Sequence, residues 1–204
     1  MTTSPTLDEF KATVRDAFGY LEREFAFHEV EPPASELEGN PFMVWFVNAT
    51  TLVQVEGINW GFAAQVLLGP AAAGHDWHAN VSLWAILKHR APDLYQGSAK
   101  SEGQLGDIRY AAHALRQAAS DVLKGDFRVM APARAMVEAD ATQLRLREQE
   151  EARDRTKKTA VKAAADAFRR KDYRSVVEHL APHLDRLTPA ERARLDYARA
   201  RAGH

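Results

Sequence analysis

Residues 41–70 read PFMVWFVNATTLVQVEGINWGFAAQVLLGP, and this stretch decides the fold class. It holds three apolar runs, at residues 42–47, 52–55 and 60–68. Turn-forming residues separate and end these runs: Asn48, Gly57 and Gly69-Pro70. Because β-branched and aromatic residues favour strands while Asn, Gly and Pro favour turns, the stretch predicts an antiparallel meander.

Both faces of the run 42–47 are apolar, which predicts a central strand that is covered on both sides. Trp45 and Trp60 are expected in the core, where each would bury about 150–250 Å². A further strand is predicted from Phe25 to Val30, and Pro32 should end it because proline has no backbone N–H to donate. The sheet should therefore have about four strands.

Helices are predicted on both sides of the meander. Thr6 and Glu9 have the spacing of a capping box, and apolar residues at helical spacing follow, which predicts a helix over 7–24. A second stripe predicts a helix over 104–124 that ends at Gly125. A short helix over 83–89 should follow Ser82, and residues 34–40 and 93–103 should be irregular. The predicted fold class is α+β, an antiparallel sheet packed by helices and followed by an all-helical C-terminal extension.

The composition changes at Pro132. A long helix is predicted over 133–158, and its second half is nearly all polar, which is typical of a helix held by charge pairs or bridging two domains. No heptad is sustained, so a coiled coil is the weaker alternative. The predicted organisation is an α+β domain at 1–131, a charged connecting helix at 132–158 and a helical hairpin-like unit at 159–204.

The charges are unevenly distributed along the chain. Residues 1–130 hold 10 Lys and Arg against 16 Asp and Glu, a net charge of −6, and residues 131–204 hold 17 against 12, a net charge of +5. The acids interleaved in the basic part favour solvated helix faces over a nucleic-acid surface. No apolar run approaches the roughly 20 residues of a membrane span, no cysteine occurs, and no signal peptide is recognisable, so a cytoplasmic protein is expected.

The segment from Ala164 to Ala202 resembles a tetratricopeptide-type helical unit. The residues that carry the resemblance are Ala164, Phe168, Lys171-Asp172-Tyr173, Val177, Leu180 and Ala198. Such units are helical hairpins, and arrays of them form peptide-binding grooves. Because no second copy occurs at a period of about 34 residues, we expect a single hairpin that packs on the long helix.

The first 130 residues resemble, in layout, small bacterial α+β proteins of uncharacterised or immunity type. The likeness rests on the order of helix, meander, short helix and closing helix, and on the segment Ser82-Leu83-Trp84-Ala85-Ile86-Leu87. It implies binding to another protein, such as a cognate toxin. No functional residue follows from it.

The only local cluster of potential metal ligands is His75, Asp76 and His78. It could form part of a zinc or iron site if His89 or His113 supplied a further ligand. His179 and His183 are four residues apart, but Pro182 interrupts the helix that would align them. Because an ordinary surface loop next to small residues is much the better explanation of the cluster, we assign no metal-binding residue.

No motif for catalysis is present. The sequence lacks a Gly-x-Ser-x-Gly elbow, a cysteine nucleophile and a glycine-rich phosphate loop. We therefore assign no catalytic residue and no cofactor, and we predict that the protein is not an enzyme. Trp77, in a polar loop, is a candidate interface anchor.

These observations predict a non-catalytic protein–protein interaction module, of which an immunity-like protein is one form. The 70–80 loop and an exposed edge or face of the sheet are the expected contact surfaces, and the partner is another protein that the sequence does not identify. The alternative is a small metal-dependent enzyme or binder that uses His75, Asp76 and His78.

Overall fold

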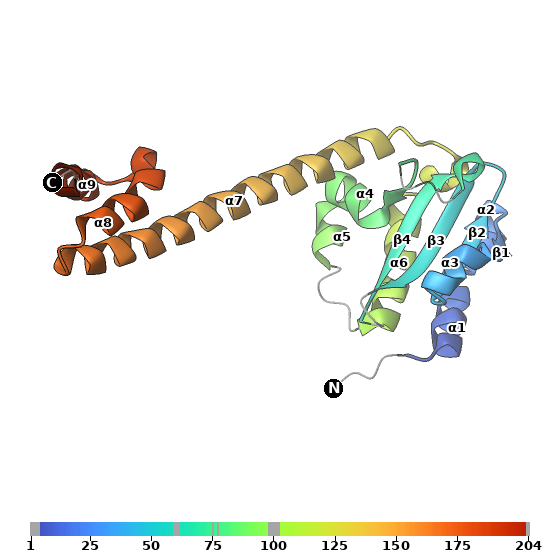
Figure 1. Cartoon of the computed structure of the whole chain (residues 1–204). Helices are drawn as coiled ribbons and strands as arrows, with labels where there is room; N and C mark the ends of the chain where they lie inside the picture. Colours follow the sequence, from blue (N-terminus) through green and yellow to red (C-terminus); the bar gives the residue numbers. More distant parts are fainter. Residues whose placement is uncertain (1–4, 59–61, 75, 77, 98–102, 203–204) are drawn as a thin grey trace. The chain divides into compact units, whose positions relative to one another are not determined.

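The computed structural model describes residues 5–58, 62–74, 76, 78–97 and 103–202 (Figure 1). The chain divides into two compact units, Met1–Ala139 (unit 1) and Asp140–His204 (unit 2). Unit 1 contains the sheet and its packing helices, and unit 2 is helical in its described residues. The predicted α+β class is therefore confirmed.

Within the described residues of unit 1, five strands form one antiparallel sheet in the order β1-β2-β3-β4-β5. The strands are β1 His28–Val30, β2 Met43–Val47, β3 Thr51–Ile58, β4 Ala63–Pro70 and β5 Val81–Ser82. The meander predicted from residues 41–70 is confirmed as β2, β3 and β4 (Figure 1). The strand beyond the expected four is β5, which pairs through two residues only and was too short to give a sequence signal.

Helices surround the sheet in unit 1. Their bounds are α1 Leu7–Phe18, α2 Tyr20–Phe25, α3 Ala34–Gly39, α4 Leu83–Arg90, α5 Pro92–Gly97 and α6 Gly103–Ala118, with short 3₁₀ turns η2 Ala71–Ala73 and η4 Val122–Lys124. The capping box predicted for α1 is present, because Thr6 Oγ1 accepts from Glu9 N while Glu9 Oε2 accepts from Thr6 N. Ser82 caps α4 through Trp84 N at 3.2 Å.

One face of the sheet holds the core of unit 1. Alternate residues of the central strands point to this face and pack with α1 and α6: Val44, Phe46, Val53, Val55, Val66 and Leu68. Phe10, Phe18 and Leu115 of the helices are fully buried against them. Burying each such side chain contributes about 1.5–3 kcal/mol, so this layer supplies much of the stability of unit 1.

The opposite face of the sheet is buried as well. Met43 and Trp45 are 6% and 5% exposed, and the intervening residues Val44 and Phe46 are each 1% exposed. Burial on both sides of β2, predicted from its sequence, is therefore confirmed. Gln54 and Glu56 of β3 lie on this second face and are also buried.

The helices differ from the sequence prediction at their ends. The predicted helix 7–24 is interrupted at Gly19, and the predicted helix 104–124 ends at Ala118, with Gly125 (φ 88°) closing the 3₁₀ turn that follows. Residues 34–40 and 93–103 were predicted to be irregular, but α3 and α5 form there. Pro33 and Pro92 stand at the beginnings of these helices, where a proline favours a helix instead of ending it.

A 40-residue helix, α7 Met130–Arg169, continues past residue 158, where the connecting helix was predicted to end and the hairpin-like unit to begin. Pro132 lies in the first turn of α7. Backbone N–H groups have no intrahelical acceptor there, so the absence of an N–H in proline costs no hydrogen bond. Most side chains from Val137 to Thr156 are exposed, and Glu151 pairs with Arg155 one turn later at 3.7 Å. Among the described residues, no helix combines the length and the apolar character that crossing a membrane requires.

Unit 2 also contains α8 Tyr173–Leu180, the 3₁₀ segment η5 Ala181–Arg186 and α9 Pro189–Ala202. Its buried core is small and contains Ala164, Ala167, Val176, Leu180, Leu187, Leu195 and Ala198. Thr188 and Glu191 form a capping box at the start of α9, in which Thr188 N donates to Glu191 Oε2 at 2.8 Å. Three of the positions that carry the tetratricopeptide resemblance, Ala164, Leu180 and Ala198, lie in this core.

Candidate protein-docking groove

A groove in unit 1 begins where strand β1 ends. β1 pairs with β2 in a register that joins His28 to Val47 and Val30 to Trp45. The same register would place Pro32 opposite Met43, but proline has no N–H for the ladder. β1 therefore stops at Val30, and the chain turns into α3.

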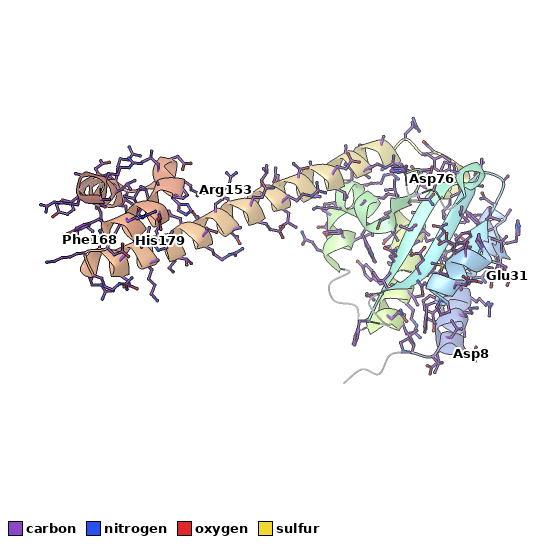
Figure 2. The ribbon with its side chains drawn as sticks, in the orientation of Figure 1. Asp8, Glu31, Asp76, Arg153, Phe168 and His179 are labelled. Carbon is purple, nitrogen blue, oxygen red and sulfur yellow. The ribbon has the colours of Figure 1, made fainter. Side chains whose placement is uncertain are left out.

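The shortened edge strand leaves a cavity of about 350 Å³ beside β2. Its walls come from α1, β1, the segment that follows β1, α3 and β2. Apolar side chains line its floor: Val30, Pro32, Leu37, Met43 and Val44. Charged side chains surround them: Lys11, Arg15, Glu29 and Glu31. Figure 2 shows Glu31 at the surface of unit 1.

An ion pair joins the α1 wall to the β1 wall. Arg15 donates from Nε and Nη2 to the two carboxylate oxygens of Glu29, both at 2.8 Å. These hydrogen bonds hold the pKa of Glu29 below its ordinary value and raise the pKa of Arg15. Both side chains therefore stay charged near neutral pH. The ion pair holds α1 and β1 together at this wall of the groove.

The remaining charges of the groove are Lys11 and Glu31. Among the described residues, neither side chain is in an ion pair. Lys11 is half-buried and Glu31 is exposed. An apolar floor with a polar rim of both signs is the usual anatomy of a protein-binding surface.

A second cavity of about 350 Å³ lies elsewhere in unit 1, next to η4 and the start of α7. His89, Arg90, Asp121, Asp126 and Arg128 supply its polar lining. Arg90 donates to Asp121 at 2.7 Å, and Arg128 holds the pKa of Asp126 at about 2 through hydrogen bonds. Each carboxylate in this lining is therefore paired with an arginine of the same lining.

Unit 2 has a cavity of about 640 Å³ at its surface, lined by residues of η5 and α9. Leu184 contributes a side chain that is 41% exposed. Arg192 crosses this region and donates to the Leu184 carbonyl at 3.1 Å. The lining also contains Asp185 and Asp196, and none of these residues forms an acid–base pair suited to catalysis.

The cluster predicted as an alternative metal site is only partly described. His75 and Trp77 lie outside the described residues. Asp76 and His78 are exposed, and Asp76 Oδ1 accepts from the backbone N of His78 at 2.8 Å, so this carboxylate stabilises a local turn. No group of three or more His, Cys, Asp or Glu side chains able to hold a metal occurs among the described residues.

The other predicted ligands do not approach this turn in the described structure. His89 lines the second cavity of unit 1, and His113 is exposed on α6. His179 lies on α8 and His183 lies in η5, where its backbone leaves the helical region at φ −114° and ψ 19°. That kink follows Pro182, which explains why the two histidines do not align.

The expected contact surfaces are less open than the sequence implied. The central strands β2 and β3 are buried on both faces, and the edge strands β1 and β5 have only three and two residues. Short edge strands of this kind limit pairing with other chains. In the 70–80 segment, Asn80 is buried and donates to the Gly74 carbonyl at 3.1 Å, so this part of the loop is fixed in the fold.

The groove depends on residues that the sequence analysis did not connect. Lys11, Val30, Leu37 and Met43 are far apart in the sequence, and only the register of β1 on β2 brings them together. The proline after β1 was the available signal, because it marks where an edge strand must stop.

Comparison with known proteins identifies no relative: no family model, no curated protein and no solved structure matches the chain.

Proposed function

We propose that the protein is a non-catalytic protein-binding module, with an immunity-like role as its specific form, and that the groove beside β2 is its docking site. The observation that supports this proposal is the composition of the groove, in which half-buried Val30 and Leu37 lie beside charged side chains of both signs. The occupant is a segment of a partner protein that places a large apolar side chain against the half-buried Val30 and Leu37.

Charge complementarity favours a basic partner. Residues 1–130, which contain the whole groove, have a net charge of −6. Such a field attracts a basic surface and speeds its association. The exposed carboxylate of Glu31 at the rim is placed to meet a Lys or Arg of the partner.

The test is affinity capture from the native host followed by binding measurements with the purified partner. Leu37→Glu places a charge on the apolar floor without disturbing a fully buried position, since Leu37 is half-buried. We expect it to weaken binding at least tenfold. Phe62→Glu is the matched control, because Phe62 is 64% exposed and does not line the groove.

A partner that binds the wild type and Phe62→Glu equally, binds Leu37→Glu weakly and is released by salt supports the proposal. A partner that is insensitive to Leu37→Glu but lost with Phe62→Glu docks elsewhere and contradicts the groove assignment. A protein that remains alone under all capture conditions contradicts the binding function itself.

A further inference from the structure

The middle of α7 has an exposed face opposite the side that packs within unit 2. Asp154 accepts from Arg186 at 2.7 Å and Lys157 pairs with Glu191 at 3.1 Å, so these residues mark the side that faces η5 and α9. Glu150, four residues before Asp154, also contacts Arg186. Two residues along an α-helix turn by about 200°, so Glu148 points away from Glu150 and from the rest of unit 2.

Small and apolar side chains flank Glu148 on this outward face. At spacings of three and four residues it carries Ala141, Leu144, Glu148, Ala152 and Arg155. Leu144 is 58% exposed, and Ala152 and Arg155 are exposed as well. In unit 2 as described, no other element covers these side chains.

This face is complementary to itself in the antiparallel direction. A two-fold axis at Glu148 would set Leu144 of one copy against Ala152 of the second copy. It would also set Ala141 against the aliphatic part of Arg155, whose side chain can cover apolar surface. In a two-fold interface every such contact occurs twice.

The charges along one flank of the face follow the same symmetry. This flank carries, in chain order, Asp140, Arg147, Glu151 and Lys158. The order acid, base, acid, base becomes base, acid, base, acid when the helix is reversed. An antiparallel copy therefore places Arg147 beside Glu151 and Asp140 beside Lys158, whereas a parallel copy in register would place like charges together.

We propose that a second copy of this chain docks antiparallel along residues 140–158 of α7. Arg147 and Lys158 support this occupant, because neither has an ion-pair partner among the described residues. The two Glu148 side chains meet at the axis and repel each other. The dimer is therefore weak and is weakened further by salt, since exposed ion pairs are screened.

Sedimentation equilibrium of the full chain at several concentrations and salt levels tests the proposal. Arg147→Glu and Glu151→Arg should each weaken the dimer about tenfold, because each change turns two attractive contacts into repulsive ones. The double variant should restore association. Glu148→Gln should strengthen the dimer by removing the repulsion at the axis.

Arg153→Glu is the matched control. It makes the same change of charge on α7, but Arg153 projects from another side of the helix (Figure 2). Circular dichroism of each variant verifies that the helix remains folded. A wild-type chain that stays monomeric at every concentration, a dimer that responds to Arg153→Glu as it does to Arg147→Glu, or a double variant that does not recover would each overturn the proposal.

Discussion

Gly69 of β4 lies directly against the side chain of Asn80. A Cβ added at Gly69 would stand 1.7 Å from Oδ1 of Asn80, far inside van der Waals contact. Asn80 is 7% exposed and is held by hydrogen bonds from its Nδ2 to Gly74 O and to Gln54 Oε1. Because Gly69 has no side chain, Asn80 can pack directly against the backbone of β4 on the second face of the sheet.

Substituting Gly69→Ala should destabilise unit 1 by about 1–3 kcal/mol, the usual effect of overpacking a closed site. Urea unfolding followed by tryptophan fluorescence measures this change. The double variant Gly69→Ala with Asn80→Ala should cost less than the sum of the two single changes, because the shorter side chain removes the clash. Strict additivity would show that the two residues do not meet.

Substituting Glu29→Gln should destabilise the folded protein at pH 7 by less than about 1 kcal/mol, as is typical of surface ion pairs. The hydrogen bonds from Arg15 hold the pKa of Glu29 below its ordinary value of 4.5. A lowered carboxyl pKa stabilises the fold above that ordinary value, and the stabilisation is lost as the pH falls through the folded-state pKa. The difference between wild type and Glu29→Gln in thermal unfolding should therefore shrink as the pH falls below the ordinary value of 4.5. A difference that grows on acidification would contradict the assigned pair.

Tyr20→Phe should cost about 0.5–1.5 kcal/mol in the free energy of unfolding, the usual net value of one hydrogen bond. The hydroxyl of Tyr20 donates to the Ala112 carbonyl at 3.1 Å and ties α2 to α6. Burial raises the pKa of this phenol, so it should not ionise at alkaline pH before unit 1 unfolds. Ultraviolet absorbance during an alkaline titration measures how many tyrosines ionise. If all five tyrosines ionised at an ordinary pKa in the folded protein, the assigned burial of Tyr20 would be contradicted.

Leu195→Ala should destabilise unit 2 by about 2–5 kcal/mol, because Leu195 is fully buried in a core of few residues. All four tryptophans, Trp45, Trp60, Trp77 and Trp84, belong to unit 1. Tryptophan fluorescence should therefore report an unchanged transition, while far-ultraviolet circular dichroism should show an earlier loss of helix. An equal shift of both signals would mean that the two units unfold together.

Much of the fold was predictable because its signals are local. The capping box at Thr6 and the apolar runs around Phe46 depend on neighbouring residues, and the structure confirms them. The short helices α3 and α5 were not predicted. Pro33 and Pro92 stand at their beginnings, and proline occurs both at the first positions of helices and in irregular segments.

The docking groove was not predictable from the sequence because it depends on a non-local register. Leu37 and Met43 line the same cavity as Lys11 because β1 ends at Val30, two residues before Pro32 would pair with Met43. Binding at the 70–80 loop and at an edge or face of the sheet was the expectation from the sequence, and it stays a prediction. The groove that we propose lies at the other end of the sheet order, beside β1.

Amide hydrogen exchange of the full chain, with and without the captured partner, tests the docking site most directly. The proposal predicts slower exchange on binding in residues 29–44 and in the part of α1 around Lys11, with little change in α8 and α9. Unchanged exchange in residues 29–44, with protection that appears elsewhere, would contradict it.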